Sequence, residues 1–271
     1  MSDISKRIER AEKNLQKGKP EAALAEYLEI LDEEPENEAV CHTAADLCVS
    51  LARNSEAARL LGGLFDRQFS AGESARAAVT YKKLARIGKP TGNQSFQFAE
   101  SLAKNSKDAL RAYQAALQSY LEKSSHSEAV AALGGIVRLE PTFENYRKLG
   151  DVASDAGHNA TASHAYIAAG DLAANDVAKL GMYERAWKFA PDVLDTSLKY
   201  AQALLEQNNA AAAVDVLAPI AQAGFADPAS RAVYGKALLM CVRAQQAAPM
   251  VWETYQHDPS TVADVAEVIR L

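Results

Sequence analysis

Few residues in this sequence have the types and the spacing that catalysis or metal binding requires. Cys41 and Cys48 are seven residues apart, which in one helix separates them by about 10 Å along the axis. A single zinc ion with bonds of about 2.3 Å cannot bridge that distance. We therefore interpret both cysteines as buried core thiols and predict no metal site. The odd cysteine count, which Cys241 completes, is typical of reduced thiols in the cytoplasm.

Other catalytic signatures are incomplete. His158 and His164, the nearest pair of histidines, are six residues apart and face different sides of a helix. Lys89 follows a glycine as in a phosphate-binding loop, but Pro90 stands where that loop has Ser or Thr. A Gly-Glu-Ser-Ala-Arg stretch begins like the nucleophile elbow of hydrolases but ends in Arg76 instead of glycine. We expect a protein that is not an enzyme and has no cofactor.

The elements that carry these residues are predicted to be helices almost throughout. Alanine, the best helix former, accounts for 54 of the 271 residues, whereas the helix breakers Gly and Pro number only 14 and 9. With 48% apolar residues, 24% charged residues and a net charge of −6, the composition is that of a folded protein. No apolar run is long enough for a signal peptide or a membrane span, so we expect a cytoplasmic protein with no membrane partner.

Apolar residues recur at helical spacing from end to end, beginning with Ile4, Ile8, Ala11 and Leu15. Gly and Pro punctuation ends this first helix, and a second is predicted from about residue 21 to 33. Further breaks are expected near residues 54, 71–72, 90–93, 105–106, 124–127, 141, 157–159, 175, 191, 208–209, 224–228, 245–249 and 259. The pattern predicts an all-α fold of roughly 14–16 short helices, which must pack on their neighbours to be stable.

Internal repeats support a stack of helices. Residues 55–65 resemble residues 127–137, including a Gly-Gly pair in each. Prolines that stop helices recur at Pro35, Pro90, Pro141 and Pro191, at intervals of 50 to 55 residues. Both spacings indicate a unit of one helix plus its turn. Between residues 54 and 141, however, the proline spacing favours groups of three helices over pairs, so the pairing there stays open.

Two segments carry the spacing of a known repeat. In residues 143–175 the pattern is carried by Tyr146, Leu149, Gly150, Ala153, Gly157, Ala162 and Tyr166. In residues 4–36 it is carried by Gly18, Ala23, Tyr27 and Pro35, although Arg7 and Arg10 replace the usual Trp and Leu. These segments resemble the tetratricopeptide repeat. The resemblance implies a right-handed α-solenoid of antiparallel hairpins over residues 1–271 that acts as a protein-interaction scaffold with a concave groove.

Two groups of residues are candidates for binding. In the best-matched repeat, the groove would present Glu144, Arg147, Asp151 and Asp155, at spacings that allow ion pairs within the helix. Residues 53–89 hold five more basic than acidic residues. Within them, a candidate basic patch consists of Arg76, Lys82, Lys83 and Arg86. It could attract an acidic segment or nucleic acid, but no aromatic residues interleave with it for base stacking.

Three further expectations concern partners. Some tetratricopeptide proteins grip acidic chaperone tails with Lys and Asn, but the corresponding positions here hold Ile8, Glu12 and about Thr43, so we predict no such clamp. We expect a protein or peptide partner rather than nucleic acid. The alternatives are a nucleic-acid-binding helical repeat that uses the basic residues of 53–89 and a structural or assembly role. The assembly role would use Val214, Val216 and Leu217 or the terminal helices. Because no polar helix caps the C-terminal end, we also expect the chain to continue or to self-associate there.

Overall fold

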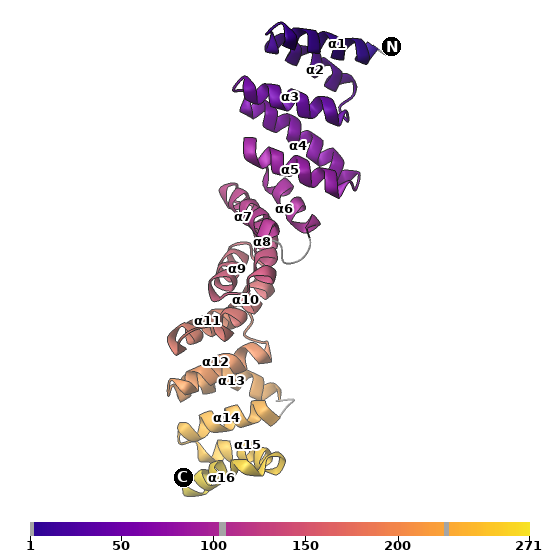
Figure 1. Ribbon diagram of the computed structural model, residues 1–271. Coiled ribbons are helices and arrows are strands. Elements are labelled where there is room, and N and C mark those ends of the chain that lie inside the picture. The colour runs from indigo at the N-terminus through magenta and orange to yellow at the C-terminus, as the bar shows by residue number, and fades with distance from the viewer. Residues whose placement is uncertain (1–2, 103–106, 225–227) are drawn as a thin grey trace. The chain divides into compact units, whose positions relative to one another are not determined.

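The computed structural model describes residues 3–102, 107–224 and 228–271, and Figure 1 shows its helices in chain order. The described residues form helices and no strand, which confirms the all-α prediction. The helices are α1 (Asp3–Gln16), α2 (Pro20–Glu33), α3 (Glu38–Ser50), α4 (Asn54–Ser70), α5 (Ser74–Ile87), α6 (Gly92–Ser101), α7 (Lys107–Glu122), α8 (His126–Leu139), α9 (Phe143–Asp155), α10 (Asn159–Asp171), α11 (Asp176–Phe189), α12 (Leu194–Glu206), α13 (Ala210–Ala223), α14 (Pro228–Met240), α15 (Ala244–His257) and α16 (Val262–Arg270), with a 3₁₀ helix, η1 (Pro259–Thr261). The predicted break at 105–106 lies outside the described residues.

The chain divides into two compact units, Met1–Leu139 and Glu140–Leu271. In each unit, a helix packs against the one before it and the one after it, as Figure 1 shows for α1 to α5 and for α12 to α16. The pairing that the sequence left open is now defined. Helix α4 packs against both α3 and α5, and α6 packs against α7.

Seven turns between helices share one backbone geometry. Each contains one residue with a φ between 56° and 76°, and the next residue donates its N–H to a carbonyl five positions earlier, as His158 does to Ala153 at 2.8 Å. This bond satisfies a carbonyl of the last helical turn and reverses the chain. The residues with positive φ are Gly18, Ala52, Gly72, Ser124, Gly157, Asn208 and Val242.

One predicted break is wrong. The sequence placed it at residues 245–249, but α14 ends at Met240, the turn is at Val242, and α15 already begins at Ala244. Pro249 lies inside α15, where its ring removes one backbone amide hydrogen. Valine rarely adopts a positive φ, so no residue type in the sequence marks this turn. The four prolines predicted to follow helix ends do so, as Pro35 follows α2 and Pro191 follows α11.

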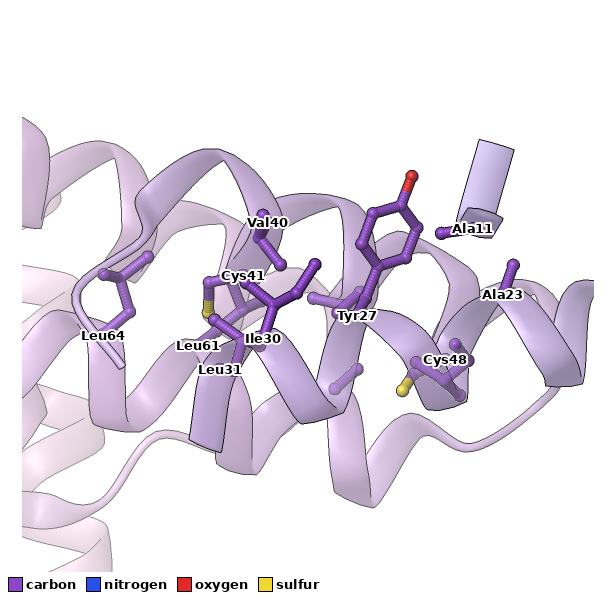
Figure 2. Packing of buried hydrophobic residues seen from close by; sticks show 14 of the residues in the cluster. Ala11, Ala23, Tyr27, Ile30, Leu31, Val40, Cys41, Cys48, Leu61 and Leu64 are labelled. Carbon is purple, nitrogen blue, oxygen red and sulfur yellow. The ribbon is translucent and has the colours of Figure 1, made fainter. Parts of the chain in front are cut away.

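The core of the first unit begins between α1 and α4. Ala23, Tyr27 and Cys48 are at most 5% exposed and pack in one apolar cluster with Ala11 of α1. Figure 2 shows this cluster, with the sulfur atoms of Cys41 and Cys48 at separate places along α3. Both thiols are buried and neither forms a disulfide, which confirms their interpretation as core residues. Burial is also the main cause that raises the pKa of each thiol.

The second unit has its own core around α12 to α15. Val214, Val216 and Leu217 are 3%, 7% and 0% exposed there. The expectation that these three residues form a self-association surface is therefore wrong. These residues are buried because α12 and α14 pack against α13.

Candidate functional site

A strip of four charged side chains runs along α9. Thr142 caps the start of this helix, where its hydroxyl accepts the backbone N–H of Asn145 at 3.3 Å. The helical repeat then places Glu144, Arg147, Asp151 and Asp155 on one face, as the sequence predicted. The strip is only partly open to solvent, since the side chains of Arg147 and Asp151 are 40% and 38% exposed.

Arg147 is held by its neighbours along the strip. Its Nη2 lies 2.7 Å from Oε2 of Glu144, and its Nη1 lies 3.2 Å from Oδ2 of Asp151. The hydrogen bond to Glu144 is the main cause that raises the pKa of Arg147, so this guanidinium stays charged. Asp155, by contrast, is exposed and has no ion-pair partner among the described residues.

Asp151 joins three helices. The hydroxyl of Tyr166, on α10, donates to Oδ1 of Asp151 at 2.9 Å, and Nη1 of Arg185, on α11, donates to the same oxygen at 2.9 Å. The Arg185 guanidinium also lies 5.7 Å from the centroid of the Tyr166 ring, within reach of a cation–π contact. We call Glu144, Arg147, Asp151, Tyr166 and Arg185 the Asp151 cluster. Its polar groups are fixed before any ligand is present.

The hairpin formed by α9 and α10 explains why Tyr166 reaches Asp151. Gly157 turns the chain with a φ of 73°, and the two helices then lie very close together. A Cβ atom built on Gly150 would lie 2.6 Å from Cε1 of Tyr166, so only glycine lets the ring pack this closely against α9. The repeat pattern thus predicted the positions of the small residue Gly150, the aromatic residue Tyr166 and the turn residue Gly157. The fold is a tetratricopeptide-like helical repeat.

Comparisons with known proteins find similar solved structures that are described as tetratricopeptide repeat proteins. No family model matches the chain, and no curated protein matches it. It is similar to the structure of a tetratricopeptide repeat protein from Parabacteroides merdae, with 12% identity, 98% of each chain covered and a TM-score of 0.33. It is also similar to TTC0263, a thermophilic TPR protein in Thermus thermophilus, with 13% identity, 79% of this chain and 100% of that chain covered, and a TM-score of 0.31.

A third similar structure is YrrB, described as a TPR protein with an unusual peptide-binding site. The identity is 14%, the TM-score is 0.29, and the match covers 89% of this chain and 96% of that chain.

The sequence identified part of the Asp151 cluster. Glu144, Arg147 and Asp151 were expected from their spacing, but Tyr166 was expected only to fill the core, and Arg185 was missed. Arg185 lies 34 residues after Asp151, which is the length of one tetratricopeptide repeat. Aligning α11 with α9 as equivalent helices would have placed Arg185 beside the strip.

The four residues of the candidate basic patch do not form one free basic surface. Lys82 pairs with Asp108 of α7 at 3.0 Å, and Lys83 pairs with Asp46 of α3 at 2.8 Å. Arg76 contacts Glu73 at 3.3 Å and Glu38 at 3.9 Å. Only Arg86 has no ion-pair partner in the part of the chain that the structure describes.

Other chemistry has little support in the described residues. Within them, no three His, Cys, Asp or Glu side chains are grouped so as to hold a metal ion. Nor does any described helix combine the length and the apolar character that a membrane crossing needs. The Asp151 cluster is one set of polar groups that the fold does hold together by ion pairs and hydrogen bonds.

Proposed function

We propose that the chain is a non-catalytic protein-interaction scaffold that binds a peptide or partner helix along the face of α9 and α11. The Asp151 cluster is the observation that carries this proposal. Its side chains come from three helices and are already held by hydrogen bonds of 2.7 to 3.2 Å. A ligand that meets a fixed polar surface loses less affinity to the ordering of side chains.

The charges of this face indicate what the peptide carries. Arg147 and Arg185 are occupied by Asp151, whereas Asp155 is exposed and Glu144 has a side chain that is 69% exposed. Asp155 thus remains available, and Glu144 stays largely open to solvent although its Oε2 binds Arg147. We expect the partner to place Lys or Arg side chains opposite Asp155 and Glu144, with its backbone lying along the strip between them.

A selection experiment tests this function. Peptides are selected from a displayed library on the purified protein, and the Kd of the best one is measured by fluorescence anisotropy. Asp155→Lys should weaken binding about fivefold or more, because it replaces an attraction with a repulsion. Asp192→Lys is the matched control, since Asp192 is also exposed in the second unit but lies in the loop after α11.

Equal effects of the two substitutions would exclude α9 as the binding face. A selection that yields no specific peptide would count against the scaffold itself. The chain's two buried, unpaired thiols favour a cytoplasmic location for this scaffold, and detection of the native protein outside the cytoplasm would contradict that part of the proposal.

The C-terminal end supports a second candidate function, which is assembly through self-association. Ile269 is 81% exposed and Val262 is 56% exposed, whereas Val265 and Val268 of the same helix pack on the core. Light scattering over a range of concentrations measures this association. Ile269→Glu should reduce any dimer fraction, and a protein that is monomeric at every concentration would exclude it.

A further inference from the structure

A cavity in the first unit combines an apolar floor with unpaired positive charge. It measures about 410 Å³ and opens between α5, α6 and α7. This volume suits one or two inserted side chains and exceeds what a simple inorganic anion needs. The cavity lies in a different unit from the Asp151 cluster and shares no residue with it.

The floor of the cavity is rigid and apolar. The rings of Tyr81 and Phe98 stack with centroids 4.0 Å apart and an angle of 17° between their planes. The Tyr81 hydroxyl donates a hydrogen bond to Oγ of Ser95 at 3.0 Å, which holds the ring in its orientation. Ala112 is buried beside them, and the exposed residues Ala85 and Ala115 leave the mouth of the cavity open because their side chains are small.

The rim of the cavity carries two unpaired cations. Lys82 and Asp108 neutralise each other across it at 3.0 Å. Arg86 of α5 and Arg111 of α7 also line it, and neither has an ion-pair or hydrogen-bond partner among the described residues. Because Lys82 and Asp108 neutralise each other, the residues that line the cavity have two remaining positive charges, those of Arg86 and Arg111. Guanidinium groups bind carboxylates in a bidentate geometry, through two parallel hydrogen bonds, so these arginines complement acidic side chains.

We propose that this cavity, which we call the α5–α7 cavity, is a docking site for an acidic peptide segment of a partner protein. One apolar side chain of the segment enters between Ala85 and Ala115 and rests on the floor. Flanking Asp or Glu side chains bind Arg86 and Arg111. Nucleic acid fits less well, because bases stack on exposed aromatic faces, whereas Tyr81 and Phe98 are only 6% and 3% exposed and already stack on each other.

The probe is a fluorescent synthetic peptide in which single leucines are flanked by glutamates. A counterpart with glutamine in place of every glutamate, and an oligothymidylate, are measured in parallel by anisotropy. The glutamate peptide should bind, and its affinity should fall as salt rises from about 0.1 M to about 1 M, which shortens the Debye length from about 10 Å to about 3 Å. The glutamine peptide should bind at least about fivefold more weakly.

Two sets of variants, each with its own control, locate the site. Arg86→Ala and Arg111→Ala should each weaken binding about fivefold. Arg59→Ala should not, although Arg59 belongs to the same unit and its side chain is 76% exposed. Ala115→Glu places a carboxylate four residues after Arg111 and should compete with the peptide, whereas Ala22→Glu, at an exposed position of α2, should not. Circular dichroism confirms that each variant is folded.

The proposal is overturned if the glutamate peptide fails to bind at low salt, if its glutamine counterpart binds equally well, or if Arg59→Ala has the same effect as Arg86→Ala. Tighter binding of the oligothymidylate, lost with the same arginines, would replace the acidic peptide with nucleic acid. None of these results bears on Asp155→Lys in the second unit, so the scaffold function proposed for α9 would stand or fall separately.

Discussion

The hydroxyl of Tyr166 donates a hydrogen bond to Asp151 where the Tyr166 ring packs closely against Gly150, between α9 and α10. Arg185, on the next helix, then binds the same carboxylate. Two other sets of three consecutive helices repeat this arrangement. Tyr183 and Lys199 both donate to Asp171, at 2.5 and 2.7 Å, and Tyr113 and Arg138 both donate to Glu100. A carboxylate, a tyrosine and a cation thus link each set, in addition to its apolar packing.

Removing one hydroxyl from such a link should destabilise the fold. Tyr166→Phe keeps the ring against Gly150 but loses the bond to Asp151. Because Asp151 is partly solvated, we expect a loss of about 1–2 kcal/mol in the free energy of unfolding, measured by urea denaturation. Tyr146→Phe is the control, since the Tyr146 hydroxyl has no hydrogen-bond partner among the described residues. Equal losses in the two variants would contradict a role for the bond.

The same links predict loss of stability in alkali. Burial, followed by the bond to a carboxylate, raises the pKa of Tyr113 and of Tyr166 to about 12 from an ordinary value of 10.0. Folding therefore favours the protonated phenols. Their stabilisation is complete below about pH 10, where tyrosines of the unfolded chain begin to ionise, and is lost as the pH rises toward 12.

The denaturation midpoint measures this effect. It should fall more steeply between about pH 10 and pH 12 in the native protein than in a variant with both Tyr113→Phe and Tyr166→Phe. Parallel pH profiles would show that these two hydroxyls contribute nothing to the alkaline loss.

Features that depend on local sequence could be predicted, and those that depend on distant pairing could not. Gly157 marks its turn because glycine adopts a positive φ without strain, and Pro141 marks a helix end because it cannot continue a helix. The partners Lys82 and Asp108 lie 26 residues apart on α5 and α7, and no local rule joins them. Local patterns therefore predict Lys82 as part of a basic patch, whereas in the fold Asp108 neutralises it and Arg86 and Arg111 keep unpaired charges.

The close approach at Gly150 gives a test of the hairpin. Gly150→Ala should destabilise by about 1–3 kcal/mol even though alanine favours helices, because the added methyl would lie 2.6 Å from the Tyr166 ring. Gly134→Ala is the matched control in α8, where an added Cβ meets nothing within 4 Å. That variant should gain up to about 1 kcal/mol from helix propensity. Thermal unfolding distinguishes the two, and a stabilised Gly150→Ala would show that the helices do not pack this closely.

Val242 is the one β-branched residue at a positive φ, 59°, among the described residues, and it offers a stabilising substitution. A left-handed conformation costs a residue with a Cβ about 1–2 kcal/mol, and glycine avoids this cost. Val242 is 70% exposed, so Val242→Gly gives up little buried apolar surface. Part of the gain is offset because glycine loses more entropy on folding, and we expect a net gain of about 1 kcal/mol in the free energy of unfolding. Val177→Gly removes a valine that is 78% exposed from α11 and should instead lose about 0.5–1 kcal/mol. If both substitutions lowered the urea midpoint, the turn before α15 would not have the left-handed geometry assigned to it.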